Sequence, residues 1–158
     1  MDAKIVGWGH TQFGALDQSF EDLIKAAAAE AIEMAGIGPE EIDAIWLGHF
    51  NSGMVPDAFA SSLVLGLDDR LRFTPATRVE NACASGSAAV YAARDAIRAG
   101  SAQTVLVIGA EKMTSLNTKG VTAALAGASY QTKEAGVSFP QIFARIASGY
   151  FQAYGDQS

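Results

Sequence analysis

The fold of this chain is decided by residues 79–90, which read VENACASGSAAV and hold its only cysteine, Cys83. The segment before this stretch can be extended, Gly86 allows a sharp turn, and an alanine-rich run from Ser87 meets no helix breaker until Gly100. The stretch therefore predicts a strand, a tight turn and a helix, with the sulfur of Cys83 at or near the N-terminus of that helix.

Cys83 has two interpretations. At a helix N-terminus, unpaired N–H groups and the positive end of the helix dipole favour a thiolate and can stabilise an oxyanion. A free cysteine among alanines is also commonly a small packed side chain. The neighbouring Asn81, Ser85 and Gly86 are typical of a nucleophile elbow. Cys83 is therefore the candidate catalytic residue, and a packing role is the alternative.

Strands and helices are expected to alternate along the chain. Ser19 and Asp22 form an approximate capping box, an apolar stripe follows at helical spacing, and Gly36 ends the helix. Strands are expected at 4–9, 42–48, 73–79 and 104–108, and helices at 20–35, 56–67, 87–99 and from Pro140 onward. This alternation predicts an α/β layered domain, in which helix 87–99 is almost enclosed and strand 104–108 is covered on both faces.

Length and composition limit the functions that the chain can have. With 158 residues and 49% hydrophobic residues, it can bury the core of one ordinary domain. The net charge of −6 and the scattered basic residues argue against a nucleic-acid surface. The first residues lack a signal-peptide core, and no apolar run approaches the length of a membrane span. We expect a cytoplasmic protein with no nucleic-acid partner, no membrane partner and no metal.

Residues 79–90, 99–100 and 105–114, the last reading VLVIGAEKMT, resemble the N-terminal half of a thiolase. The resemblance extends along essentially the whole chain and is nearest to the sterol-carrier-protein-type thiolase and acetyl-CoA acetyltransferase branch. It implies a three-layer α/β/α half with a mixed, mostly parallel sheet, incomplete at the C-terminus. It also implies a thiolase-like core at 1–114 and the start of a loop or lid region at 115–158.

In that family the cysteine matching Cys83 accepts the acyl group. The resemblance thus implies that Cys83 takes an acyl group from an acyl-CoA thioester in lipid metabolism, for cleavage or condensation of a C–C bond. CoA thioesters are then substrates, and no separate cofactor is expected; the substrate-binding residues are not identified. A homodimer, a tetramer or a complementary C-terminal thiolase half is the expected partner.

The family's base motifs, which resemble Asn-Glu-Ala-Phe and Gly-His-Pro, and its second cysteine motif lie C-terminal to residue 158. We therefore expect residues 1–158 to be inactive alone. The alternative from another class is a non-catalytic thiolase-fold partner or scaffold subunit. A ketoacyl-synthase relative shares a cysteine at the same corner, although residues 79–83 and 109–113 match the thiolase pattern better.

The two histidines are the local candidates for a base. His49 follows the strand at 42–48, and ligands collect at the carboxyl ends of strands in α/β sheets. His49 is therefore placed to approach Cys83 and to form with it a pair like the dyad of a cysteine hydrolase. A structural or solvent-facing histidine is the commoner case. His10 is less favoured than His49.

Overall fold

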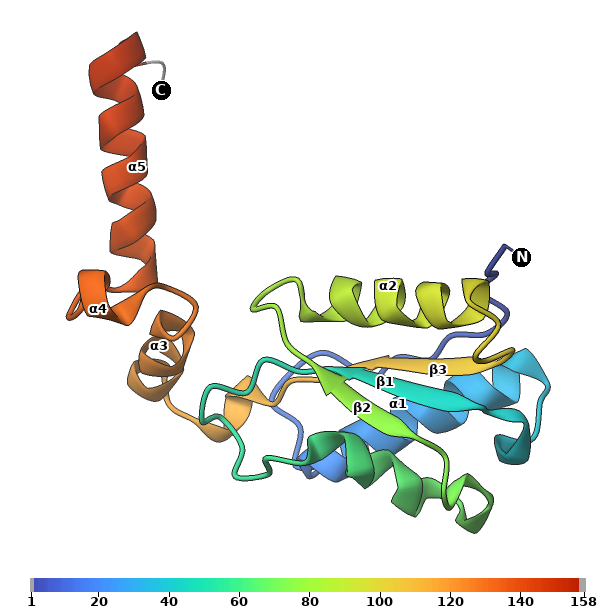
Figure 1. Ribbon diagram of the computed structural model, residues 1–158. Coiled ribbons are helices and arrows are strands. Elements are labelled where there is room, and N and C mark those ends of the chain that lie inside the picture. Colours follow the sequence, from blue (N-terminus) through green and yellow to red (C-terminus); the bar gives the residue numbers. More distant parts are fainter. Residues whose placement is uncertain (1, 157–158) are drawn as a thin grey trace.

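A parallel sheet lies between two helical layers in the computed structural model, which describes residues 2–156 (Figure 1). Its strands are β1 (Ala44–Gly48), β2 (Ala76–Val79) and β3 (Val105–Gly109), in the order β2-β1-β3. Helix α2 (Ser85–Arg98) covers one face, and helix α1 (Phe20–Ala35) with the 3-10 helix η2 (Ala60–Leu67) covers the other. The predicted three-layer α/β architecture is confirmed.

Six further helical elements lie within the described residues. They are η1 (Pro39–Glu41), η3 (Asp69–Leu71), η4 (Met113–Ser115), α3 (Thr118–Ala126), α4 (Gln131–Glu134) and α5 (Phe139–Tyr154).

The strand register brings three chain segments out at one edge of the sheet. Gly48 at the end of β1 lies opposite both Val79 of β2 and Gly109 of β3. All three strands run parallel, so the residues that follow them leave the sheet side by side. These are His49, Glu80 and Ala110.

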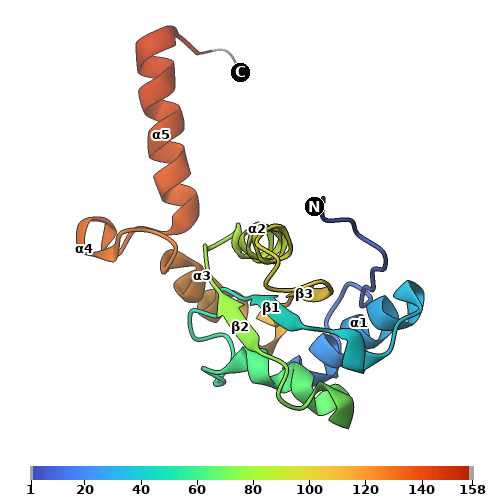
Figure 2. The ribbon, with the colours of Figure 1, turned by 45° about the vertical axis from the view of Figure 1, so that its right-hand side comes forward.

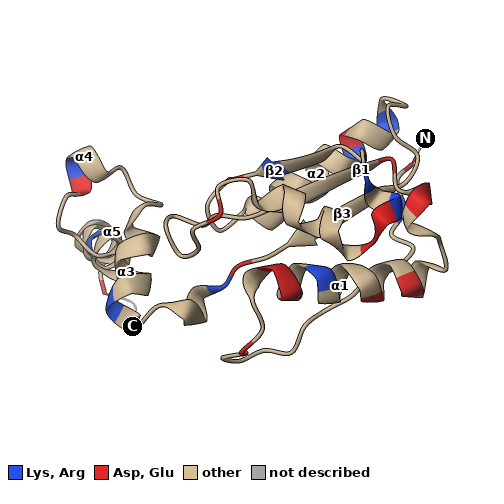
Figure 3. Cartoon of the chain, turned by 90° about the horizontal axis from the view of Figure 1, so that it is seen from below, with Lys and Arg blue, Asp and Glu red and all other residues tan. Residues whose placement is uncertain are grey.

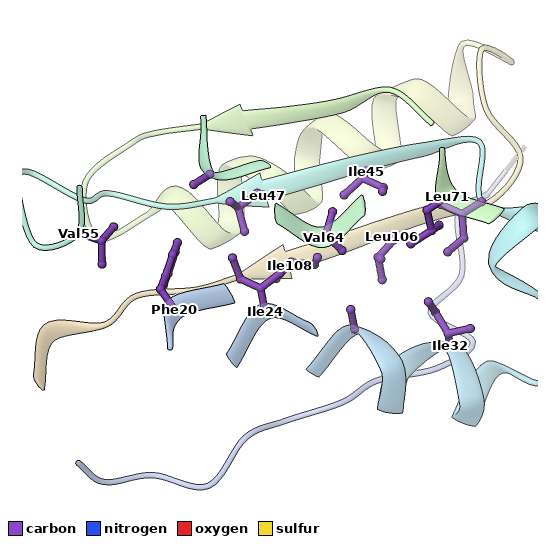
Figure 4. Packing of buried hydrophobic residues seen from close by; sticks show 13 residues of the cluster. Phe20, Ile24, Ile32, Ile45, Leu47, Val55, Val64, Leu71, Leu106 and Ile108 are labelled. Carbon is purple, nitrogen blue, oxygen red and sulfur yellow. The ribbon is translucent and has the colours of Figure 1, made fainter. Parts of the chain in front are cut away.

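The core lies between the sheet and the layer formed by α1 and η2 (Figure 4). Along β1 and β3, alternate side chains point into it, as the pleat requires. Fully burying each of the larger aliphatic side chains contributes about 1.5–3 kcal/mol. The central members of this core are Ile24, Ile45, Leu47, Val64, Leu71, Leu106 and Ile108.

Helix α1 forms as the sequence predicts. The Ser19 hydroxyl accepts a hydrogen bond from the Asp22 N–H (3.0 Å), and the Asp22 carboxylate accepts one from the Ser19 N–H (3.0 Å), which completes the capping box. Gly36 ends the helix in the left-handed region, with φ 67°. The predicted bounds, 20–35, are confirmed.

The strand predicted at 4–9 is wrong. The segment pairs with no strand and runs beside α1 (Figure 2). The side chains of Ile5 and Trp8 are exposed. Its glycines allow this close packing, since a Cβ at Gly7 would lie 2.4 Å from the Ala31 carbonyl oxygen. The apolar run therefore packs on a helix instead of extending the sheet.

Two further elements differ from the predictions. The strand expected at 73–79 is confined to β2, because Phe73 has φ 70° and Pro75 has no N–H to give to a ladder. The helix expected at 56–67 is the 3-10 helix η2.

Helix α2 is also more open than the sequence suggests. It begins at Ser85 and buries Ala89 and Ala93, but Val90 and Tyr91 are more than half exposed. The near-complete enclosure expected for this helix is therefore absent from residues 2–156.

The C-terminal region projects away from the layered body (Figure 1). As predicted, a helix begins beside Pro140, and its Phe143, Ile146 and Tyr150 are exposed. The domain division at 1–114 and 115–158 stays a prediction, and Met1, Gln157 and Ser158 lie outside the described residues.

Charged residues show no concentration of basic side chains on one element. Several acidic residues lie along α1, while lysines and arginines are spread over several elements (Figure 3). None of the helices within residues 2–156 is long and apolar enough to cross a membrane. The compartment and the absence of a nucleic-acid partner stay predictions.

Replacing Gly48 with alanine should strongly destabilise the fold. The new Cβ would lie 2.6 Å from the Ser85 carbonyl oxygen and 2.9 Å from the Gly86 Cα, both backbone atoms that α2 cannot easily move. We expect Gly48→Ala to lower the free energy of unfolding by about 1–3 kcal/mol in urea titrations.

The matched control is Gly109→Ala, at the paired end of β3, where nothing lies within 4 Å of a new Cβ. It should change the free energy of unfolding by less than about 0.5 kcal/mol. Equal effects of the two substitutions would contradict the account of the contact between β1 and α2.

Candidate active site

The only cysteine lies in a tight turn between β2 and α2. Ala82 adopts a left-handed conformation with φ 46°, which is uncommon for a residue other than glycine. The buried Ser85 hydroxyl accepts a hydrogen bond from the Asn81 N–H (2.8 Å) and donates one to the Ala82 carbonyl oxygen (2.7 Å). One hydroxyl thus holds both sides of the turn that presents Cys83.

Cys83 is exposed and lies two residues before the start of α2. The positive end of the α2 dipole is therefore near the sulfur, as the sequence predicts. Ala84 at the N-cap position provides no side-chain hydrogen bond to the helix. The first turn of α2 is thus left without a capping side chain beside the thiol.

A cavity of about 360 Å³ opens beside Cys83. Its apolar wall comes from three segments distant in sequence: the turn after β1, η4 and α3. Cys83 and Glu111 are the ionisable side chains among the described residues that line it. The apolar lining residues are Phe50, Met54, Met113 and Leu125.

Glu111 follows β3 and binds the start of the turn after β1. Its Oε2 accepts hydrogen bonds from the N–H groups of Phe50 (3.0 Å) and Asn51 (3.3 Å). Burial would raise the pKa of Glu111, but its interactions with His49 and these two N–H groups outweigh burial and hold the pKa below its usual value. The carboxyl is therefore ionised at neutral pH, and its contribution to stability is lost only as the pH falls through this lowered pKa.

His49 is a structural residue in this fold. Its ring is buried and packs against Phe20, with 4.6 Å between ring centroids. Its Nδ1 lies 3.0 Å from the Ala110 carbonyl oxygen and 3.2 Å from Glu111 Oε1, so two acceptors place a proton on Nδ1. His49 does not line the Cys83 cavity. The sheet edge brings the two residues into one region, but the hypothesis of a dyad between them is wrong.

His10 also lies apart from Cys83. Its backbone N–H donates to Glu30 on α1 (2.9 Å), and its ring contacts Phe13. Within residues 2–156, no group of three or more His, Cys, Asp and Glu side chains is placed to hold a metal ion.

The sequence does not by itself assign Glu111 to the site, and it places Ser85 beside Cys83 without predicting the role of its hydroxyl. Glu111 stands out in the sequence only as part of a family motif, although a carboxylate two residues after the end of an uncharged strand is a signal for the carboxyl edge of a sheet. The role of the Ser85 hydroxyl had no signal in the sequence, because serine at a turn commonly faces solvent.

A family model and two relatives that match nearly the whole chain show its family. The family model for the thiolase N-terminal domain matches residues 3–152. The acetyl-CoA acetyltransferase of Methanocaldococcus jannaschii is 38% identical over 157 residues, covering 98% of this chain and 40% of that protein. The corresponding enzyme of Methanothermobacter thermautotrophicus is 38% identical over 160 residues, with the same coverage. The chain thus spans about 40% of the length of these relatives.

A solved structure supports the same fold over a shorter part of the chain. The 3-oxoacyl-[acyl-carrier-protein] synthase III from Aquifex aeolicus aligns with a TM-score of 0.56 and 29% sequence identity. The alignment covers 63% of this chain and 32% of that one.

Removing the Ser85 hydroxyl should loosen the cysteine turn. Ser85→Ala leaves the Asn81 N–H and the Ala82 carbonyl without their partner, so we expect the free energy of unfolding to fall by about 1–2 kcal/mol. Ser87→Ala, at an exposed position two residues further along α2, is the control and should change it by less than about 0.5 kcal/mol. The assigned role is wrong if urea titration gives the same value for both.

Proposed function

Because the chain belongs to the thiolase family and matches its N-terminal domain along residues 3–152, we propose that Cys83 accepts an acyl group from an acyl-CoA thioester. The observation that carries the proposal is the position of Cys83. It stands on a strained turn before a helix N-terminus and opens into a cavity with an apolar wall.

The proposed step is a thioester exchange. The Cys83 thiolate attacks the carbonyl carbon of the acyl-CoA, a new C–S bond forms, and the electron pair of the carbonyl moves to oxygen. Collapse of this intermediate breaks the bond to the CoA sulfur, and CoA leaves as a thiolate that takes up a proton. The acyl group then rests on Cys83 beside the methionine and leucine side chains of the cavity.

In cleavage, Cys83 instead attacks the β-carbonyl carbon of a β-ketoacyl-CoA, the C–C bond breaks as the α-carbon takes up a proton, and the acyl group then passes from Cys83 to CoA. In condensation, the second step transfers the acyl group to the α-carbon of another acyl-CoA. Condensation requires a base to deprotonate the α-carbon and groups that hold the oxyanion. Among the described residues lining the cavity, Glu111 is the only ionisable side chain besides Cys83, and it is engaged by His49 and two amides. We therefore propose that residues 1–158 do not complete the reaction alone, and that a complementary thiolase half supplies the remaining groups.

Two other functions remain as candidates. A ketoacyl-synthase-like reaction is supported by the β-ketoacyl-[acyl-carrier-protein] synthase III of Xanthomonas euvesicatoria, which is 38% identical over 100 residues. That match covers 62% of this chain and 30% of the relative, against 98% of this chain for the acetyltransferases, which favours the thiolase-type reaction. A non-catalytic scaffold would retain the fold without needing the thiol.

The assembly and setting of the protein are also proposals. Strand β2 pairs with β1 and forms one edge of the described sheet, so a second copy has a strand edge available beside the cysteine turn. A homodimer or tetramer fits this edge and the family. We further propose that the protein acts on CoA thioesters in the cytoplasm and needs no cofactor besides its substrate.

Turnover should depend on groups outside residues 1–158. With acetoacetyl-CoA and CoA, we expect this chain alone to give no turnover or very slow turnover in a spectrophotometric assay that follows the loss of acetoacetyl-CoA. Rapid turnover would contradict the proposed need for further groups. In the assembled protein, Cys83→Ala should abolish activity, whereas unchanged activity would favour the scaffold function.

Acylation should protect Cys83 from alkylation. We expect prior incubation with acetyl-CoA to lower the rate at which iodoacetamide labels Cys83, because the sulfur is then held in a thioester. Free CoA at the same concentration is the control and should protect less. Equal labelling after both treatments would count against acyl transfer to this residue.

A further inference from the structure

Two consecutive peptide units at the end of β1 lie between opposite charges. The N–H groups of Phe50 and Asn51 donate to Glu111 Oε2, at 3.0 Å and 3.3 Å. On the other side, Arg78 Nε donates to the His49 carbonyl oxygen (3.0 Å), and Arg78 Nη2 donates to the Phe50 carbonyl oxygen (3.1 Å). Each of the peptide units 49–50 and 50–51 thus presents its N–H to a carboxylate and its carbonyl to a guanidinium.

This arrangement orients two peptide dipoles in the same direction. In a regular strand the carbonyls of consecutive residues point to opposite sides, so this parallel arrangement departs from strand geometry. The departure continues in Asn51 and Ser52, which have φ 63° and 46° in the left-handed region. Charge-assisted hydrogen bonds are stronger than neutral ones and can hold such a turn.

The turn forms one wall of the Cys83 cavity. Phe50 lies within it and Met54 follows it, and both line the cavity. The Asn51 side-chain oxygen accepts from the Val55 N–H (3.0 Å), and the Ser115 hydroxyl donates to the Met54 carbonyl oxygen (3.0 Å). The position of the turn therefore sets where two of the apolar side chains near the sulfur lie.

The two charges come from both neighbours of β1. Arg78 belongs to the edge strand β2, and Glu111 follows β3, so the turn is fixed to both sides of the sheet. Neither Arg78 hydrogen bond goes to a carboxylate. The charged side chains act on the backbone between them and form no ion pair with each other.

We propose that Glu111 and Arg78 are positioning residues that hold the turn at residues 49–51 as a wall of the Cys83 cavity. The catalytic consequence rests on the proposed function of Cys83, but the structural role does not. Neither residue supplies a proton or a nucleophile; each acts through the peptide units that it binds.

The test measures two quantities in each variant: hydrogen exchange at the amides of the turn, and the access of two maleimides of different size to Cys83. Glu111→Gln keeps the size of the side chain, but an amide cannot accept from both N–H groups and also face the Nδ1–H of His49. We expect hydrogen exchange at the Phe50 and Asn51 amides to accelerate about tenfold by NMR, while the amides of α1 keep their wild-type rates. The rate of labelling of Cys83 by N-cyclohexylmaleimide relative to N-ethylmaleimide should rise several-fold, because the loosened wall admits the bulkier reagent.

The controls separate this role from general loss of stability. Glu33→Gln removes a carboxylate from the exposed face of α1 and should change neither measurement. Glu111→Asp, which keeps the charge on a shorter side chain, should restore part of the wild-type behaviour. If Glu111→Gln does not fold, Arg78→Lys provides the test through the ratio of maleimide labelling rates, since lysine cannot reach both carbonyls as a fork.

Unchanged exchange at Phe50 and Asn51 in Glu111→Gln would overturn the proposal. So would faster exchange with an unchanged labelling ratio, because the turn would then not shape the cavity. Both readouts are independent of acyl transfer. If they change as expected but acetyl-CoA does not acylate Cys83, the proposed function fails and the positioning role stands.

Discussion

The contact between Gly48 and the first turn of α2 is the constraint on which the site depends. The backbone of Ser85 and Gly86 approaches the end of β1 so closely that a single added carbon atom would collide with it. This contact seats α2 on the sheet at the point where β2 ends. The short connection of residues 80–84 must then turn sharply, and Ala82 takes a left-handed conformation to do so. The exposed thiol is a consequence of how closely a helix meets a strand.

The cavity also depends on the parallel register of the three strands. Because β1, β2 and β3 end at the same level, the residues that follow them lie together at one edge of the sheet. That edge places the cysteine turn, the turn after β1 and Glu111 around one volume. The charges of Arg78 and Glu111 then act on backbone that no regular ladder stabilises. The sheet thus positions the site through the close contact at Gly48 and through the hydrogen bonds of Arg78 and Glu111.

Much of this could be predicted from local patterns. The capped helix at 20–35 and the strand–turn–helix order around Cys83 follow from spacing and turn residues, which act over a few positions. The segment at 4–9 could not be assigned correctly, because its glycines fit a strand and equally allow close packing on a helix. The role of His49 was also inaccessible, since a histidine after a strand reads the same whether its ring faces a cavity or the core. These errors arise where the decisive partner is distant in sequence.

The account is tested most directly by locating an acyl group on the protein. After brief incubation with acetyl-CoA, rapid acid quenching and proteolysis, peptide mass spectrometry should find one acetyl group on the peptide that contains Cys83. The group should be removable by neutral hydroxylamine, as expected of a thioester. Acetylation confined to lysines, or a Cys83 peptide that stays unmodified while free CoA is released, would contradict the claim that this sulfur receives the acyl group.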